Sequence, residues 1–205
     1  MFKNRLDAAK QIADKIPKID DVVVLAVPRG GVILGDVIAQ KLECPLDIIV
    51  SKKITPPNYS EYAIGAITHD GTLYKGEYWS KFSNDPLFEN EIAQKQEEVH
   101  RRLKAYRKNT SYNLYDKNII LVDDGIATGS TIFAILYWIR KQKPKKILLA
   151  VPVIPPNTLD KLKDYVDEVI ALIVPDDFTT VGQFYNDFSQ VTDSKICEIL
   201  NKYHG

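Results

Sequence analysis

The stretch from Ile119 to Thr131 reads IILVDDGIATGST and has the pattern of a buried strand that ends in a polar loop before a helix. Ile119 to Val122 are apolar without interruption, which is typical of a parallel strand covered on both faces. Two carboxylates, Asp123 and Asp124, follow directly, and a loop of small residues leads to Thr131. Residues 132–143 carry apolar side chains at helical spacing, which predicts a helix after the loop.

This strand, loop and helix together predict an anion site. Unpaired N–H groups at a helix N-terminus attract negative charge, and glycine lets the backbone approach the ligand closely. The carboxylates of Asp123 and Asp124 would repel a bare phosphate. They suit a ligand that carries hydroxyls or a divalent metal as well as a phosphate, and a sugar phosphate has this combination. Alternatively, either acid alone could be only a helix cap.

The rest of the chain alternates between strand and helix patterns, which predicts an α/β fold with right-handed parallel crossovers. We expect an open, mainly parallel twisted sheet flanked by helices. Strands are predicted at residues 22–27, 46–50, 119–122, 147–153 and 168–174. Helices are predicted at residues 2–16, 32–42, 85–108, 132–143, 156–166 and 193–202. A hairpin is predicted at residues 63–74, around Asp70-Gly71.

The length of 205 residues fits one domain with a sizeable core, so residues 1–205 are expected to form a single domain. Lys and Arg number 27, as do Asp and Glu, and this neutral balance argues against nucleic acid or a membrane as the main partner. The sequence has no apolar run of membrane-spanning length and no signal-peptide pattern, so a cytoplasmic location is expected. Cys44 and Cys197 lack metal-ligand spacing and read as small core residues in a reducing compartment.

A second loop of interest is Pro28-Arg29-Gly30-Gly31, which follows the predicted strand at 22–27 and precedes a helix. Adjacent glycines allow backbone conformations that other residues avoid, and they let N–H groups approach a ligand. Arg29 adds a planar donor fork that matches a phosphate. The alternative is a tight turn with a surface arginine, but the acidic loop in the same chain favours phosphate binding.

Lys52 and Lys53 come directly after the predicted strand at 46–50. Ligands of open α/β sheets bind at the carboxyl ends of the strands, so we expect one of these lysines to be functional and favour Lys53. The proline-rich loop that follows contains Tyr59 and Glu61 as further candidates. His69 lies beside the predicted hairpin turn and is expected to be solvated.

The run VDDGIATGST, residues 122–131, resembles the phosphoribosyl pyrophosphate signature of type I phosphoribosyltransferases. The resemblance implies that Asp123 and Asp124 hold the ribose hydroxyls and help to seat Mg²⁺, through water or through those hydroxyls. It also implies that the loop holds the 5′-phosphate. The residues of this loop are Gly125, Ile126, Ala127, Thr128, Gly129, Ser130 and Thr131.

In the same family, a loop after the first strand grips the pyrophosphate, often through a strained peptide bond. The resemblance assigns this role to Arg29, Gly30 and Gly31, together with Lys53 or Lys52. It further implies a mobile loop and hairpin at residues 55–78 that close over the site, a small hood formed by residues 174–205, and a homodimer.

The C-terminal run VPDDFTTVGQFYNDF, residues 174–188, is similar to the Pro-Asp-x-Phe…Val-Gly segment of hypoxanthine-guanine phosphoribosyltransferases. That likeness implies that Phe178 stacks on the acceptor base, although one extra residue separates it from Val181-Gly182. Phe184, Tyr185 and Phe188 could instead be core residues.

Residues 22–193 as a whole resemble a family of predicted phosphoribosyltransferases whose acceptor is unsettled. Ala127 stands where 6-oxopurine enzymes of this fold carry an aspartate, whereas the C-terminal run resembles those enzymes. The acceptor is therefore left open at this point.

The function expected from these residues and resemblances is Mg²⁺-dependent transfer of the 5-phosphoribosyl group from phosphoribosyl pyrophosphate to a nitrogenous base. The base is expected to be a purine or a related base, and pyrophosphate is released. Two alternatives remain: a non-catalytic sensor of phosphoribosyl pyrophosphate or a nucleotide, and a hydrolase that releases ribose 5-phosphate.

Overall fold

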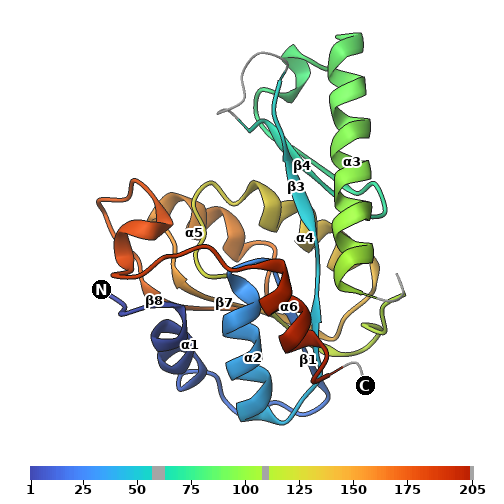
Figure 1. Ribbon diagram of the computed structural model, residues 1–205. Helices are drawn as coiled ribbons and strands as arrows, with labels where there is room; N and C mark the ends of the chain where they lie inside the picture. Colours follow the sequence, from blue (N-terminus) through green and yellow to red (C-terminus); the bar gives the residue numbers. More distant parts are fainter. Residues whose placement is uncertain (57–62, 108–110, 204–205) are drawn as a thin grey trace. The chain divides into compact units, whose positions relative to one another are not determined.

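The computed structural model describes residues 1–56, 63–107 and 111–203 (Figure 1). The chain divides into two compact units. The first unit contains Met1–Ile48, Asn113–Thr128 and Lys143–Gly205. The second unit contains Ile49–Tyr112 and Gly129–Gln142. Tyr59 and Glu61 lie outside the described residues, as does most of the predicted mobile loop.

The first unit is built on a five-stranded sheet with the order β2-β1-β6-β7-β8, in which every neighbouring pair is parallel. Its strands are β1 (Val22–Ala26), β2 (Leu46–Ile48), β6 (Asn118–Val122), β7 (Lys146–Val153) and β8 (Glu168–Ile173). The predicted open parallel sheet is thereby confirmed. The central strand β6 is apolar because both of its faces are covered, and Ile119 to Val122 are at most 1% exposed.

The helices of the first unit are α1 (Arg5–Ala13), α2 (Gly31–Leu42), α5 (Pro156–Lys163) and α6 (Asp193–Leu200). α1 and α2 pack on each other and on the sheet, and α6 packs on α2. α1 begins later than predicted, because the Asn4 side chain caps it by accepting from the Asp7 N–H. Leu6 of α1 is 47% exposed, because the helix buries its alanine face and Ile12.

The N-terminal residues pair with the C-terminal segment, residues 174–205. The Phe2 N–H donates to the Phe184 carbonyl at 2.8 Å, and the Asn186 N–H donates to the Phe2 carbonyl at 2.8 Å. Tyr185 is buried, with its ring centroid 5.2 Å from that of Phe2 and 4.9 Å from that of Phe188. Tyr185 is therefore a core residue, as the alternative interpretation of this segment expected.

The second unit contains the antiparallel sheet β3-β4-β5, formed by Ser51–Ile54, Gly65–Thr68 and Leu73–Lys75. Two helices, α3 (Pro86–Tyr106) and α4 (Ser130–Lys141), pack against it. All four residues of β4 are buried, which shows that both faces of this strand are covered. The predicted hairpin is confirmed, but a third strand, β3, was missed because polar residues dominate it.

The expectation that His69 is solvated is wrong. His69 is 9% exposed, with its ring 5.1 Å from that of Trp138, and burial lowers its pKa. On α3, Leu87 is 61% exposed, whereas its neighbour Phe88 packs against Trp79. A hairpin turn does not by itself show which residues a distant helix covers.

The cysteines also differ from expectation. Cys44 and Cys197 form no disulfide, and both are of intermediate exposure instead of being fully buried core residues. Burial of the thiol nevertheless raises the pKa of Cys44 to about 11, which keeps it protonated and unreactive near neutral pH.

Candidate functional site

The acid pair Asp123-Asp124 lies at the carboxyl end of β6 in the first unit, as predicted. The Asp123 carboxylate accepts the Asp124 N–H at 2.8 Å, so the first acid braces the turn that places the second. The Asp124 side chain is 14% exposed, which leaves it reachable but mostly desolvated. Neither acid is an N-cap of α4, whose N-cap is Gly129. The helix-cap alternative is therefore excluded.

Glycine is required at positions 30 and 31 because neighbouring atoms lie too close to leave room for a side chain. Neither glycine has a positive φ, so the expectation that they adopt conformations closed to other residues is wrong. A Cβ on Gly30 would fall within the Asp124 carboxylate, and a Cβ on Gly31 would lie 2.8 Å from the Val122 carbonyl oxygen. The two glycines thus let the N-terminus of α2 meet the tip of β6, where the helix dipole favours negative charge.

Part of the backbone of the loop at residues 28–31 is hydrogen-bonded within the protein. The Gly31 N–H donates to the Val27 carbonyl at 3.1 Å, and the peptide bond between Pro28 and Arg29 is cis. The Arg29 guanidinium is 3.9 Å from Asp193 at the start of α6, with its side chain 32% exposed. Arg29 therefore reaches the surface at the end of the sheet where the acid pair lies.

Arg5 is part of this site and was not predicted. Its Nε donates to Asp124 Oδ2 at 2.6 Å. No local pattern marked this residue, because its partner lies 119 positions away in the sequence. The only signal in the sequence was that an acid pair largely removed from water needs a counter-charge, and this does not indicate which basic residue supplies it.

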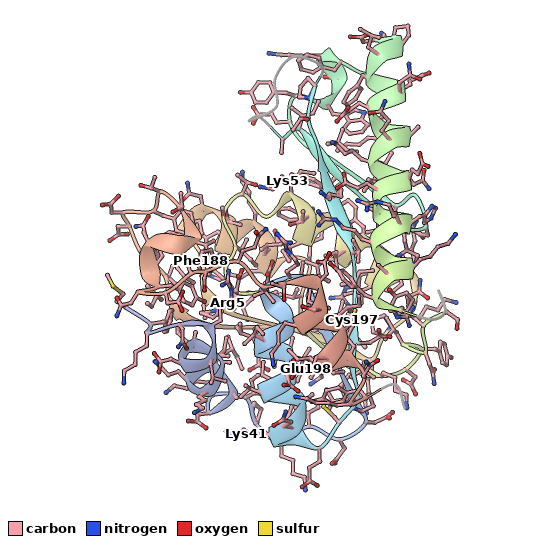
Figure 2. The ribbon with its side chains drawn as sticks, in the orientation of Figure 1. Arg5, Lys41, Lys53, Phe188, Cys197 and Glu198 are labelled. Atoms are coloured by element: carbon pink, nitrogen blue, oxygen red, sulfur yellow. The ribbon has the colours of Figure 1, made fainter. Side chains whose placement is uncertain are left out.

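The C-terminal segment also contacts the acid pair. The Tyr185 hydroxyl donates to the main-chain carbonyl of Asp124 at 2.5 Å. Figure 2 shows Arg5 beside Phe188, and the Arg5 guanidinium lies 3.8 Å from the centre of that ring. Two aromatic residues of the C-terminal segment thus support the second acid, one directly and one through Arg5.

Burial and mutual repulsion control the charge of the pair. Burial raises the pKa of Asp123 well above its ordinary value, and the neighbouring Asp124 raises it further. Burial also raises the pKa of Asp124, whereas the Arg5 guanidinium opposes that rise. The two carboxylates therefore bind a proton more readily than solvated aspartates do, and a ligand that donates hydrogen bonds or brings positive charge would favour their ionised forms.

The loop after the acids remains in the first unit as far as Thr128. Gly125 passes so close to Val181 that a Cβ at this position would clash with the valine side chain. The Ile126 N–H donates to the Val153 carbonyl at 2.9 Å, and the Thr158 hydroxyl donates to the Ala127 carbonyl at 2.6 Å. These bonds join the loop to the end of β7 and to α5, so its backbone path is fixed.

The remaining residues of the predicted phosphate loop belong to the second unit. Gly129 has a φ of 76°, a left-handed conformation that favours glycine, and it is the N-cap of α4. Ser130 begins this helix and is buried, and Thr131 follows it. The predicted helix N-terminus after the loop is confirmed, although it begins two residues earlier than the sequence pattern indicated.

Lys52 and Lys53 point to opposite faces of β3 in the second unit. Lys52 Nζ lies 2.6 Å from Glu98 on α3 and forms an ion pair with it. Lys53 is exposed, and its contact with a ligand stays a prediction. Both lysines follow the parallel strand β2, as expected, but they do not follow it directly. β2 ends at Ile48, and the lysines lie within the next strand, β3.

Phe178, the predicted base-stacking residue, is partly exposed in the first unit. Its ring is stacked on that of Phe184, with centroids 5.8 Å apart and planes inclined by 26°. One face of Phe178 is therefore supported by another aromatic ring of the C-terminal segment.

The described residues contain no group of three or more His, Cys, Asp or Glu side chains placed to hold a metal ion. The helices within residues 1–56, 63–107 and 111–203 are also too short or too polar to cross a membrane.

Known proteins resemble this chain in sequence and in fold. Residues 2–189 match the family described as phosphoribosyl transferase domain. Two proteins of Mycobacterium tuberculosis, from strains CDC 1551 and H37Rv, are each named "Putative phosphoribosyl transferase" and are 33% identical over 213 residues. The alignment covers 100% of this chain but 47% of each relative, so the chain spans about half of their length.

A solved structure, that of the protein TT1426 from Thermus thermophilus, resembles the whole chain. It has a TM-score of 0.83 and 33% sequence identity, and the match covers 100% of this chain and 99% of the other.

Proposed function

This chain belongs to the phosphoribosyl transferase family, and on that premise we propose that it transfers the 5-phosphoribosyl group of phosphoribosyl pyrophosphate to a nitrogenous base. The observation that carries the proposal is the Asp123-Asp124 pair, desolvated at the end of β6 and placed against the N-terminus of α2. Asp123 and Asp124 accept hydrogen bonds from the ribose hydroxyls. A carboxylate can accept about four hydrogen bonds, so the bond from Arg5 leaves capacity for a hydroxyl.

The 5′-phosphate binds to the loop that begins at Gly125. Its later residues, Gly129 to Thr131, lead into α4, and a helix N-terminus preceded by glycine suits a phosphate. Arg29 and Lys53 bind the pyrophosphate. The sequence pattern and the exposure of each side chain support this assignment. Gly30 and Gly31 serve mainly to bring α2 close to the acids.

The reaction breaks the bond between ribose C1 and a pyrophosphate oxygen and forms a bond from C1 to a base nitrogen. The pyrophosphate leaves with the bonding electrons, and the base nitrogen loses its proton to solvent. Positive charge develops on the ribose ring in the transition state, and the two carboxylates on its hydroxyls stabilise that charge. Orientation of the base and the ribose supplies the rest of the rate enhancement.

Magnesium fits this arrangement as a partner of the ligand. Asp123 and Asp124 offer the hard oxygen donors that Mg²⁺ prefers, and Mg²⁺ is commonly held by one or two carboxylates plus substrate phosphates and water. The lack of a larger acidic cluster among the described residues is compatible with that mode. When bound, Mg²⁺ would neutralise charge on the departing pyrophosphate.

We propose a purine or a related base as the acceptor, with Phe178 stacking on it. The support is the partly exposed Phe178 ring, backed by Phe184. Ala127 supplies no carboxylate near the base, so a 6-oxopurine would lose its proton to water. We also propose that the chain works as a homodimer, as its family resemblance implies, and that it is cytoplasmic, as expected from its sequence pattern.

The test is turnover of labelled phosphoribosyl pyrophosphate with Mg²⁺ and a panel of bases. We expect pyrophosphate release that requires one class of base, and loss of that release in D123N and D124N. D160N, which changes an exposed acid on α5, is the matched control and should retain full activity. Binding without turnover for every base would favour a sensor, and turnover independent of base would favour a hydrolase; either result would overturn the proposed transfer.

A further inference from the structure

Thr158, in the first turn of α5, is a buried polar residue whose partner lies in the loop after the acid pair. It is 7% exposed, and its hydroxyl donates to the Ala127 carbonyl at 2.6 Å. Both residues belong to the first unit. The hydroxyl caps no N–H of its own helix, since α5 has no side-chain cap. Its hydrogen bond therefore acts on the loop.

The loop at residues 125–128 is fixed on both sides of one free donor. The Ile126 side chain is buried, and the Ile126 N–H donates to the Val153 carbonyl at 2.9 Å. The carbonyl of the next residue, Ala127, is bound by Thr158. Among the residues that the structure describes, the Ala127 N–H has no hydrogen-bond partner. An unpaired backbone N–H in a loop before a helix is a donor that an anion can use.

The bond from Thr158 also determines the orientation of the peptide between Ala127 and Thr128. This peptide is trans, so its C=O and its N–H point in opposite directions. The carbonyl oxygen, which carries partial negative charge, is turned towards α5, and the N–H edge of the peptide is turned away from α5. A phosphate on that side of the loop therefore avoids the repulsion of this carbonyl oxygen.

We propose that Thr158 is a positioning residue of the 5′-phosphate site: it holds the Ala127 carbonyl away from the phosphate, so that the loop presents N–H groups to the ligand. The inference rests on the proposed function, because it assigns a role within the same site. Thr158 acts through Ala127 and does not touch the ligand. Without the hydroxyl, the Ala127 carbonyl loses its partner and is free to turn towards the phosphate, which it repels.

A hydrogen bond that only joined the loop to α5 would have a different consequence. Its loss would lower the free energy of unfolding and leave the affinity of the folded protein for every ligand unchanged. Loss of orientation in the loop instead weakens the ligands that carry a 5′-phosphate and spares a ligand that lacks it. Ribose 5-phosphate carries this group, whereas pyrophosphate, assigned to Arg29 and Lys53, does not.

The experiment is calorimetric titration of wild type, T158V and T158S with phosphoribosyl pyrophosphate, ribose 5-phosphate and pyrophosphate, each with Mg²⁺. Valine keeps the branched shape of threonine and removes the hydroxyl, whereas serine keeps the hydroxyl. We expect T158V to bind the two ligands with a 5′-phosphate roughly 10-fold more weakly than the wild type, because a desolvated carbonyl is left without a partner. Its affinity for pyrophosphate should be unchanged, and T158S should recover most of the lost affinity.

Urea unfolding measures the stability of each variant separately from its affinity. N157A, an exposed change in the same turn of α5, is the matched control and should bind all three ligands as the wild type does. If T158V does not fold, hydrogen exchange of the wild type decides. The Ala127 amide should then be protected when ribose 5-phosphate binds and should not be protected when pyrophosphate binds. An Ala127 amide that stays unprotected with ribose 5-phosphate would overturn the proposed orientation of the loop.

A wild type that binds neither phosphoribosyl pyrophosphate nor ribose 5-phosphate would overturn the proposed function. If the wild type binds both, two results would overturn only the role of Thr158. One is a T158V variant of lower stability and unchanged affinities, and the other is an equal loss of affinity for all three ligands.

Discussion

Gly30 lies directly against the carboxylate of Asp124, so closely that a side chain at position 30 would occupy the same space as the carboxylate and lie 2.7 Å from Arg5 Nε. This close contact brings together the loop that contains Gly30 and the loop that contains Asp124, which the sequence patterns indicated separately. It explains why a small residue is needed at the N-terminus of α2 even though Gly30 has an ordinary helical φ of −62°.

The variant G30A should displace the Asp124 carboxylate and weaken binding of phosphoribosyl pyrophosphate by at least about 10-fold, since overpacking costs about 1–3 kcal/mol. Its fold should survive, because the clash is with the end of a side chain. G31A is the contrasting variant: its Cβ would meet the main chain of β6, so it should lower the free energy of unfolding instead. Calorimetric titration and urea unfolding would separate the two effects. Equal affinity in G30A and wild type would contradict the placement of Asp124 in the site.

The variant D123N should stabilise the protein near neutral pH while weakening ligand binding. Because the pKa of Asp123 is raised in the folded state, folding favours the protonated acid, and stability is lost as the pH rises from the unfolded-state pKa towards the folded-state pKa. Asparagine does not ionise, so the D123N variant does not lose stability in this way as the pH rises. The gain should be largest at about pH 8 and should shrink towards about pH 4.

Urea unfolding at several pH values measures this difference. D160N on the exposed surface of α5 is the control and should change stability by no more than about 0.5 kcal/mol. A D123N variant that is less stable than wild type at every pH would show that burial and the neighbouring Asp124 do not destabilise the ionised Asp123 carboxylate.

The two adjacent lysines of β3 should behave differently. K53M should weaken binding of phosphoribosyl pyrophosphate by roughly 10- to 100-fold, as expected for loss of a charge-assisted hydrogen bond to phosphate. K52M should change affinity little and should lower stability by at most about 1 kcal/mol, because it removes a surface ion pair with Glu98. Calorimetric titration of both variants with phosphoribosyl pyrophosphate tests whether Lys53 is the lysine that binds it. Weaker binding in K52M and unchanged binding in K53M would assign that role to Lys52.

The predicted acceptor contact can be tested with F178A. Loss of aromatic stacking on a base costs about 1–3 kcal/mol, so the KM for the acceptor should rise roughly 10-fold while the KM for phosphoribosyl pyrophosphate stays unchanged. V174A, at an exposed position of the same segment, is the control. Steady-state kinetics with each substrate varied in turn give both constants. A rise in the KM for phosphoribosyl pyrophosphate alone would place Phe178 outside the base site.

Local patterns predicted much of the fold, because they record burial and turn chemistry. The apolar run that ends at Val122, the acids and the small-residue loop predicted β6 and α4 to within two residues at each boundary. Parallel strands leave such a signal because both faces are covered. The strand β3 left none, since Lys52 and Lys53 each face a polar or exposed environment.

Contacts between distant parts of the chain could not be predicted in the same way. Arg5 looked like an ordinary polar residue at the start of a packing helix, and only the pairing of the two chain ends brings it to Asp124. His69 looked solvated for the same reason, because the turn beside it does not reveal that Trp138 covers it. Neither residue stands in a recognisable motif, so their surroundings depend on the tertiary fold.

A crystal structure with phosphoribosyl pyrophosphate and Mg²⁺ tests the central claim most directly, namely that the acid pair and the loop behind it bind a phosphorylated pentose. We predict ribose hydroxyl oxygens within about 3.0 Å of carboxylate oxygens of both Asp123 and Asp124, with the 5′-phosphate at the loop that begins at Gly125. A pentose bound elsewhere, or acids that remain without ligand at a concentration that saturates binding in solution, would contradict it.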